Sequence, residues 1–315
     1  MSVHVDAELN AIAERFNSPD AAVRRVAVRQ LVDSQEPEAV ELLIQALHDE
    51  DNSVRREAAL LMNEFDAADI ASVLLESLTS ADENVRSAAA HALADLKDSA
   101  AAPALLAALD TDDTFVLASV LSALKNFRSS QSLPHALRLL QHSNAVVRRE
   151  AIAVLGYLRN PAALNDLQTR ALHDDSAEVR QAAISALAFA SADSVVDTLI
   201  QTLNDPHWQV RAETAIVIGR SKIAHAIPAL ITTTRDERWQ VREKAVEALG
   251  KLHAIAAIPA IGACAVSDIS NLRKTSIAAL GEIAHRDALP HITHALDDRD
   301  PDVRKIARWA LQQIR

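Results

Sequence analysis

One arginine recurs along nearly the whole chain at a spacing of 31 residues. The spacing doubles between the third and fourth of these arginines, where Leu117 occupies the intermediate site, and is 32 between the fourth and fifth. We call them the lattice arginines: Arg24, Arg55, Arg86, Arg148, Arg180, Arg211, Arg242, Arg273 and Arg304. A fixed period of about 20–50 residues is typical of solenoids, in which each repeat packs on the next. The pattern therefore constrains the fold more than the function.

The positions around each lattice site predict an amphipathic helix. Apolar residues stand one before and seven after the site, and a small residue usually stands three after. These offsets share one face of an α-helix. Around Arg86, for example, they are Val85, Ala89 and Leu93. The small middle residue would let a neighbouring helix approach closely.

A second apolar segment in each period predicts a second helix. Five of these segments begin near a proline 17 residues after the lattice site: Pro103, Pro134, Pro228, Pro259 and Pro290. Proline is tolerated in the first helical turn. Aspartate, asparagine and serine before each lattice site suit helix N-caps, and glycines lie at or near the ends of several second helices: Gly156, Gly219, Gly250 and Gly281.

The repeat thus predicts an all-α fold, an α-solenoid of about ten antiparallel helix hairpins forming a right-handed superhelix. No linker interrupts the array, so residues 1–315 are expected to form a single domain. The predicted repeats are approximately 1–33, 34–64, 65–95, 96–126, 127–158, 159–190, 191–221, 222–252, 253–283 and 284–315.

The pattern D-x-x-V-R-x-x-A-x-x-x-L-G, repeated near 31 residues, resembles the short HEAT-like repeats of phycobilisome bilin lyases. The resemblance covers essentially the whole chain. It implies that aspartates and arginines of successive repeats form a polar ladder, and that the second helices line a concave side.

The lattice arginines have two interpretations. In the structural one, cap carboxylates such as Asp20, Asp51 and Asp82 hold them in place. In the functional one, they form a row that binds anions. The geometry of the guanidinium group, which matches a carboxylate in a bidentate pair, favours the structural interpretation.

Composition narrows the setting and the partners. The single cysteine, Cys264, suits a reducing compartment, and neither a secretory signal nor a run of about 18 apolar residues is evident. We therefore expect a cytoplasmic monomer without a membrane partner. Residues 1–110 hold 21 acidic against 8 basic side chains, a net charge of −13, whereas residues 111–315 have a net charge of +2. Such an acidic segment disfavours nucleic acid as a partner.

Catalytic signatures are missing from the sequence. HEAT-repeat enzymes of the deoxyhypusine hydroxylase kind ligate two irons with His-Glu pairs, and no histidine here precedes a glutamate. His48-Asp49 and His173-Asp174 come nearest, but we expect both in loops. His285, His291 and His294 could hold a metal, although surface histidines are the simpler interpretation. Cys264 lies in an apolar run and suits a core position. We predict no catalytic residue, metal or cofactor.

The exposed positions of the second helices form the predicted partner surface. Positions one, five and nine after the lattice site are charged at both ends of the array but small, apolar or aromatic in the middle. Arg149, Tyr157, Phe189 and Ile216 lie there, with Tyr157 and Phe189 as anchors, unless these two rings pack inside. Trp208 and Trp239 form a second candidate pair for partner binding. Each stands three residues before a lattice arginine, in consecutive repeats. The alternative is that both rings pack over the helix caps.

The function expected from these features is that of an interaction scaffold that binds a protein or peptide on the concave face, with an enzyme complex or cofactor assembly as one setting for it. The alternative is an enzyme or enzyme subunit of the bilin (tetrapyrrole) lyase type. The sequence leaves the partner and pathway open.

Overall fold

The computed structural model describes residues 2–33, 37–47, 49–61, 65 and 67–314. Within these ranges every regular element is a helix, and the prediction of an all-α fold is confirmed. Twenty α-helices follow one another in pairs, joined by turns and by single-turn 3₁₀ segments. No helix in the described ranges is both long and apolar enough to cross a bilayer.

The chain forms two compact units, Met1–Leu158 and Arg159–Arg315. We call them unit 1 and unit 2; the division falls between the predicted repeats 127–158 and 159–190. The single continuous domain, its superhelical hand and the monomeric state remain predictions.

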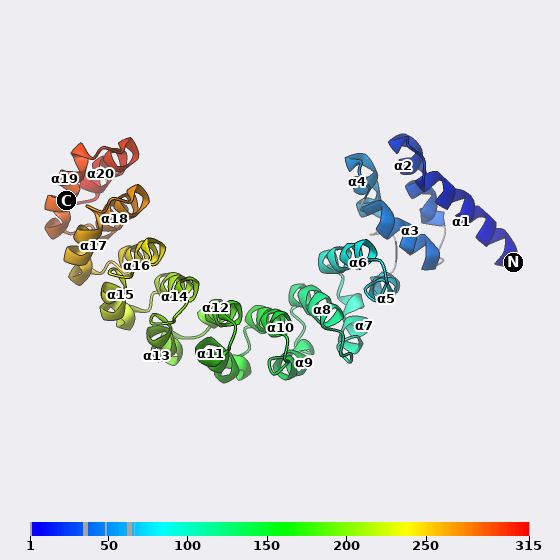
Figure 1. Cartoon of the computed structure of the whole chain (residues 1–315), viewed down its shortest axis with the longest axis horizontal. Helices are drawn as coiled ribbons and strands as arrows, with labels where there is room; N and C mark the ends of the chain where they lie inside the picture. The colour runs from blue at the N-terminus through cyan, green and yellow to red at the C-terminus, as the bar shows by residue number, and fades with distance from the viewer. Residues whose placement is uncertain (1, 34–36, 48, 62–64, 66, 315) are drawn as a thin grey trace. The chain divides into compact units, whose positions relative to one another are not determined.

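Unit 1 contains the first ten helices (Figure 1): α1 (Ser2–Phe16), α2 (Ala21–Gln30), α3 (Pro37–Leu47), α4 (Asn52–Leu61), α5 (Ala67–Ser77), α6 (Glu83–Asp95), α7 (Ala102–Ala107), α8 (Thr114–Phe127), α9 (Ser132–Leu139) and α10 (Ala145–Leu158). Unit 2 contains α11 (Leu164–His173), α12 (Ala177–Ala186), α13 (Ala192–Thr202), α14 (Trp208–Arg220), α15 (Ile227–Thr233), α16 (Trp239–Lys251), α17 (Ile258–Cys264), α18 (Ser270–Ile283), α19 (Leu289–His294) and α20 (Pro301–Gln313). The even-numbered helices are the second helices of the pairs, and in unit 2 each packs on the next from α12 to α20.

Several helix starts follow from local chemistry, whereas α14, α16 and α18 begin after His207, Arg238 and Ile269 without the expected side-chain cap. The side chains of Asp20, Asp82 and Asp113 accept hydrogen bonds from backbone amides in the first turns of α2, α6 and α8, which stabilises donors that the helix itself leaves unpaired. The predicted prolines are likewise in first turns; Pro228 and Pro259 are the second residues of α15 and α17. Proline costs nothing there because its missing N–H would have no partner inside the helix.

The residues three after each lattice site, from Ala27 to Ala307, are fully buried in both units. Two of them are polar. Thr214 and Ser276 turn their hydroxyls onto the carbonyls of Val210 and Leu272, at 2.8 and 2.7 Å, so the core contains no unpaired hydroxyl at these positions.

Two predicted core positions are wrong. Val23 and Val85, each one residue before a lattice arginine, are 37% and 39% exposed, whereas the equivalent Val54, Val147 and Val210 are fully buried. Both exceptions lie in unit 1. Met62, another residue of the predicted core face, lies outside the described residues.

The second-helix glycines of unit 2, Gly219, Gly250 and Gly281, lie in the last turns of their helices and contact the next second helix. A Cβ atom on Gly219 would lie 2.8 Å from the Cα of Ala248, and one on Gly250 would lie 2.9 Å from the Cα of Ala279. Gly281 meets α20 in the same way. The absence of a side chain lets successive second helices approach closely, as the small residues of close-packed helix pairs do. The left-handed residue after these helices is instead a non-glycine residue, such as Lys222 with φ 54°.

Candidate functional site

Each lattice arginine donates from Nη1 to a backbone carbonyl six residues before it. Arg180 bonds the carbonyl of Asp174 at 2.7 Å, and Arg211 bonds that of Asp205 at 2.8 Å. The same bond recurs at the other seven sites: Arg24 to Ser18, Arg55 to Asp49, Arg86 to Ser80, Arg148 to His142, Arg242 to Asp236, Arg273 to Ser267 and Arg304 to Asp298. This bond links the loop between the two helices of a repeat to the second helix that follows it.

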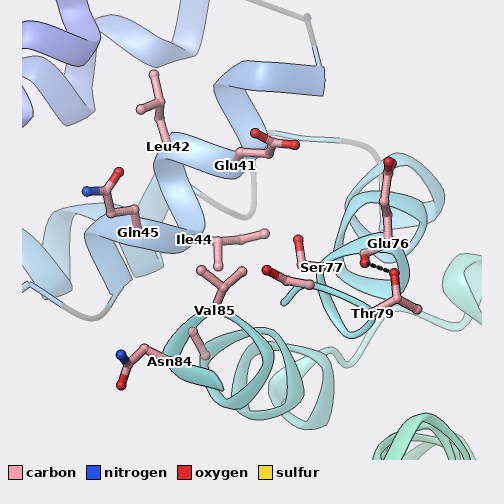
Figure 2. Close-up of a pocket in the computed structure, with 11 residues that line it drawn as sticks. Glu41, Leu42, Ile44, Gln45, Glu76, Ser77, Thr79, Asn84 and Val85 are labelled. Carbon is pink, nitrogen blue, oxygen red and sulfur yellow. Dashed lines mark hydrogen bonds between the residues drawn. The ribbon is translucent and has the colours of Figure 1, made fainter. Parts of the chain in front are cut away.

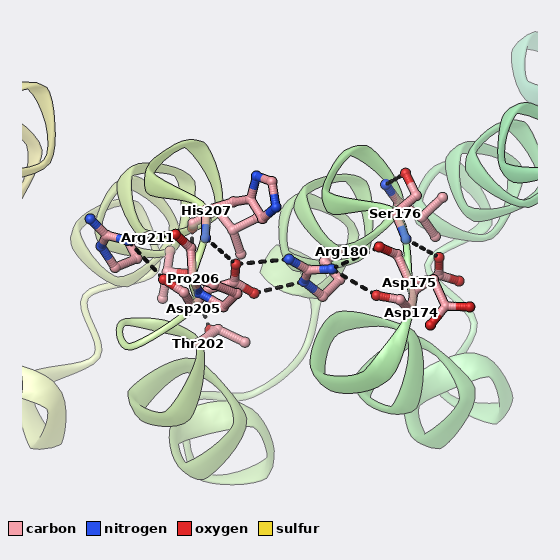
Figure 3. A network of polar contacts seen from close by, with 12 residues as sticks. Asp174, Asp175, Ser176, Arg180, Thr202, Asp205, Pro206, His207 and Arg211 are labelled. Atoms are coloured by element: carbon pink, nitrogen blue, oxygen red, sulfur yellow. Dashed lines mark hydrogen bonds and ion pairs between the residues drawn. The ribbon is translucent and has the colours of Figure 1, made fainter. Parts of the chain in front are cut away.

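Four lattice arginines also hold a carboxylate 25 residues further along the chain. In Figure 3, Nε and Nη2 of Arg180 donate to the two carboxylate oxygens of Asp205 at 2.7 and 2.9 Å. The other pairs with this geometry are Arg24–Asp49, Arg211–Asp236 and Arg273–Asp298. Because each aspartate belongs to the following predicted repeat, the pair joins successive repeats.

These partners differ from the expected ones. Asp20, Asp51 and Asp82 accept bonds from the backbone amides of Ala22, Ser53 and Asn84, at 2.7–2.8 Å. The carboxylate of each N-cap aspartate therefore accepts a hydrogen bond from its own helix. The carboxylate that pairs with the arginine lies two residues earlier in the loop than the N-cap, on the next repeat, and only the stacking of the repeats brings it near.

The pairs lower the pKa of their carboxyl groups. The hydrogen bond from Arg24 holds the pKa of Asp49 below its usual range. At Asp205 burial would raise the pKa, but the bonds from Arg180 and from the His207 amide outweigh it, and the pKa is again lowered. Both carboxylates are therefore ionised at neutral pH and pair with permanently charged arginines.

Leu117 replaces arginine at the irregular lattice site. It lies in α8 and is 1% exposed. An apolar residue there needs neither the loop carbonyl nor the carboxylate that the arginines bond, and Thr111 stands six residues before it.

The predicted surface residues of unit 1 lie on α10. Tyr157, in the last turn, is 48% exposed, so the alternative that its ring packs inside is wrong. The guanidinium carbon of Arg128 lies 5.8 Å from the centre of that ring, within the range of a cation–π contact. Arg149, two turns earlier, is exposed and forms an ion pair with Glu150 at 2.9 Å.

Phe189 and Ile216 belong to unit 2, and both are half-buried. Phe189 lies in a 3₁₀ turn, Leu187–Phe189, directly after α12, and Ile216 lies in the middle of α14. The grouping of these two residues with Tyr157 and Arg149 into one surface remains a prediction.

Trp208 and Trp239 are the first residues of α14 and α16, and both are half-buried. They therefore stand at equivalent places on two packed helices of unit 2. Sequence reasoning missed Trp309, which is 41% exposed on α20 and covers Gly281. Trp309 stands five residues after Arg304, which is one of the offsets of the predicted surface, so the sequence pattern could have identified it.

The histidines and the cysteine have structural surroundings. His173 ends α11, so its expected place in a loop is wrong, whereas His48 lies outside the described residues. The His291 ring packs against Gly262 of α17. Cys264 is buried at the end of α17, and burial raises the pKa of its thiol. In the described part of the chain, no three His, Cys, Asp or Glu side chains are grouped closely enough to hold a metal ion.

Cavities open between neighbouring repeats. One of about 760 Å³ lies in unit 1 between α3, α5 and α6, where Glu41 and Glu76 flank Ile44 and the exposed Val85 (Figure 2). Ser80 also lines it, and this serine stands 25 residues after Arg55, where other repeats have the pairing aspartate. Two further cavities, of about 700 and 480 Å³, lie between successive pairs of repeats in unit 2.

Comparison with known proteins identifies the family. The model for HEAT repeats matches residues 9–80, 54–125, 116–188, 196–273 and 263–315. The chain belongs to the HEAT-repeat family. These repeats, together with the described helix pairs, make the fold an all-α solenoid, as predicted. The bilin-lyase subclass of the repeat is a resemblance only, and a search of curated proteins found no match.

Solved structures similar to this HEAT-repeat chain share its fold at low identity. An engineered protein from the Northeast Structural Genomics Consortium is 21% identical over 97% of this chain and 98% of its own, with a TM-score of 0.50. YibA of E. coli is 18% identical over 95% and 98%, with a TM-score of 0.52. A chain from the structure of Kap95p with RanGDP is 17% identical over 98% of this chain, with a TM-score of 0.64. Our chain spans about half the length of that last one.

Proposed function

We propose that this HEAT-repeat protein is an interaction scaffold that binds a partner protein or peptide on the exposed side of its second helices. The observation that supports the proposal most directly is the exposure of Tyr157, the chain's single tyrosine, on a second helix whose neighbouring residues Val154 and Leu155 are buried. Exposed aromatic side chains are common anchors in protein interfaces. The fold shared with a chain from the Kap95p–RanGDP structure, a complex between proteins, agrees with a binding role.

Tyr157 suits an anchor because its ring is already supported. Arg128, the left-handed residue that ends α8, places its guanidinium 5.8 Å from the ring centre. A side chain held in this way loses little conformational freedom on binding, and that freedom is one of the main costs of forming an interface. The ring offers an apolar body and a hydroxyl, which suits a partner with an aliphatic or aromatic residue next to a polar group.

On the corresponding side of unit 2, charged residues neutralise one another. Glu247 pairs with Lys244 at 3.1 Å and with Lys251 at 2.7 Å, all on α16. Ser185 of α12 donates to Glu213 of α14. With these groups engaged, the half-buried Ile216 and Phe189 are apolar positions that a partner could cover, as expected of the apolar centre of an interface.

The test is affinity purification with mass spectrometry on three forms of the chain: wild type, Tyr157→Ala and the control Phe115→Ala. Phe115 is also an exposed aromatic residue of unit 1, at the start of α8, but it lies off the proposed surface. We expect a polypeptide that the wild type and the control enrich equally, and that Tyr157→Ala enriches at least tenfold less at an unchanged melting temperature. Equal recovery by all three forms would refute Tyr157 as the anchor. A coloured purified protein would instead favour the lyase-type alternative.

A further inference from the structure

Four lattice arginines of unit 2 are followed by a residue 25 positions later, and at one of them that residue is not an aspartate. Arg180, Arg211 and Arg273 pair with aspartates 25 residues later, whereas the residue 25 after Arg242 is Ser267. Within the described residues Arg242 bonds only the carbonyls of Asp236 and Glu237, at 2.7 and 3.3 Å, and both bonds use Nη1. Its Nε and Nη2, the two donors that hold a carboxylate in the other repeats, therefore have no partner in this part of the protein.

Arg242 lines a pocket, which we call the Arg242 pocket. It has a volume of about 480 Å³, within the range of small-molecule sites. Its walls are largely apolar and come from α15, α17 and α18: Ile231, Pro259, Ala260, Ala263 and Leu272. Arg235 and Arg242 are its charged lining residues, so the pocket has a positive charge without a counter-charge in its own walls.

The equivalent cavity one repeat earlier is the natural comparison. It contains Arg211 at the position of Arg242, but Asp205, Asp236 and Glu237 also line it. Asp236 occupies both Nε and Nη2 of Arg211, at 2.7 and 2.9 Å. The Arg242 pocket therefore lacks the acidic lining of the earlier cavity, including the carboxylate that pairs with the guanidinium there.

We propose that the Arg242 pocket binds a carboxylate attached to a short apolar chain, with Nε and Nη2 of Arg242 as its bidentate donors. The planar guanidinium of arginine matches the two oxygens of a carboxylate, and the neighbouring pairs show that this backbone holds the guanidinium in the required orientation. The apolar walls select a ligand with a hydrocarbon substituent, since they offer few partners to a fully hydrated anion. The carboxylate has two possible sources, a free small acid or the C-terminus of a peptide.

The first experiment measures binding of hexanoate by calorimetry, with hexanamide as the uncharged control, to the wild type and to Ser267→Asp. The new aspartate would stand where Asp236 stands for Arg211, so it should occupy Arg242 from within the chain and keep the protein folded. We expect hexanoate to bind the wild type at least tenfold more tightly than Ser267→Asp, and more tightly than hexanamide. In parallel, acetyl-Ala-Ala-Leu as the free acid and as the amide tests the peptide source; preference for the acid that Ser267→Asp removes would assign the pocket to a C-terminus.

Cys264 gives a second readout because it is the chain's single cysteine and lines the same pocket. Iodoacetate and iodoacetamide alkylate the same sulfur atom and displace iodide, but only iodoacetate has a carboxylate. We expect the alkylation rate with iodoacetate, divided by the rate with iodoacetamide, to be at least threefold higher in the wild type than in Ser267→Asp. If neither acid binds, or if Ser267→Asp leaves both the affinities and this ratio unchanged, the proposal is wrong.

Discussion

Removal of the Asp205 carboxylate should destabilise unit 2 by about 3 kcal/mol. Arg180 and Asp205 share two charge-assisted hydrogen bonds of 2.7 and 2.9 Å, and their side chains are only 8% and 6% exposed. Loss of one member of a buried pair costs about 3–5 kcal/mol, because the other charge stays buried without a partner. We take the lower end because Arg180 keeps its bond to the Asp174 carbonyl.

The assay is denaturant unfolding followed by tryptophan fluorescence, with Asp205→Ala, Arg180→Met and the double variant as a thermodynamic cycle. Trp208 begins the helix that follows the loop of Asp205 and reports on unit 2. The cycle should give a coupling free energy of about 2 kcal/mol, and Asp205→Ala should lower the melting temperature by about 6–12 °C.

Arg242→Met is the matched control, since Arg242 occupies the same lattice position without a carboxylate partner. It should cost only about 1 kcal/mol, the value of an ordinary hydrogen bond. If Arg180→Met and Arg242→Met cost the same, the arginine–aspartate pair contributes nothing beyond the loop carbonyl bond, and the reasoning fails.

Two further predictions concern pH and helix packing. Because the pKa values of Asp49, Asp205 and Asp298 are lowered in the folded state, their stabilisation is complete above the unfolded pKa of about 4 and is lost as pH falls through the lower folded values. The melting temperature should therefore drop below about pH 4, and more gently in Asp205→Ala; parallel curves would contradict the assignment. Gly219→Ala should cost about 1–3 kcal/mol despite the higher helix propensity of alanine, because its Cβ would lie 2.8 Å from the Cα of Ala248. A melting temperature that stays level or rises in thermal unfolding would show that α14 and α16 can separate freely.

For each candidate surface, the repeat pattern predicts some features and leaves others to the tertiary structure. The position of Tyr157 on a second helix followed from its offset to Arg148, but its exposure depends on what packs over the end of α10. The Arg242 pocket was visible only as an irregularity, a serine 25 residues after an arginine. The serine became informative only because the structure pairs Arg180, Arg211 and Arg273 with aspartates at the same separation.

The sequence by itself determined the helix pairs, the buried face around Ala27 and its equivalents, and the aspartate N-caps of α2, α6 and α8, because these depend on contacts within one turn or one helix. The tertiary structure alone decided which carboxylate each arginine binds, which helix Gly219 and Gly250 contact, and why Val85 lies at the surface when Val54 does not. These depend on the offset between stacked repeats. That offset is set by how all the side chains of two neighbouring repeats fit together, and no single period of the sequence contains it.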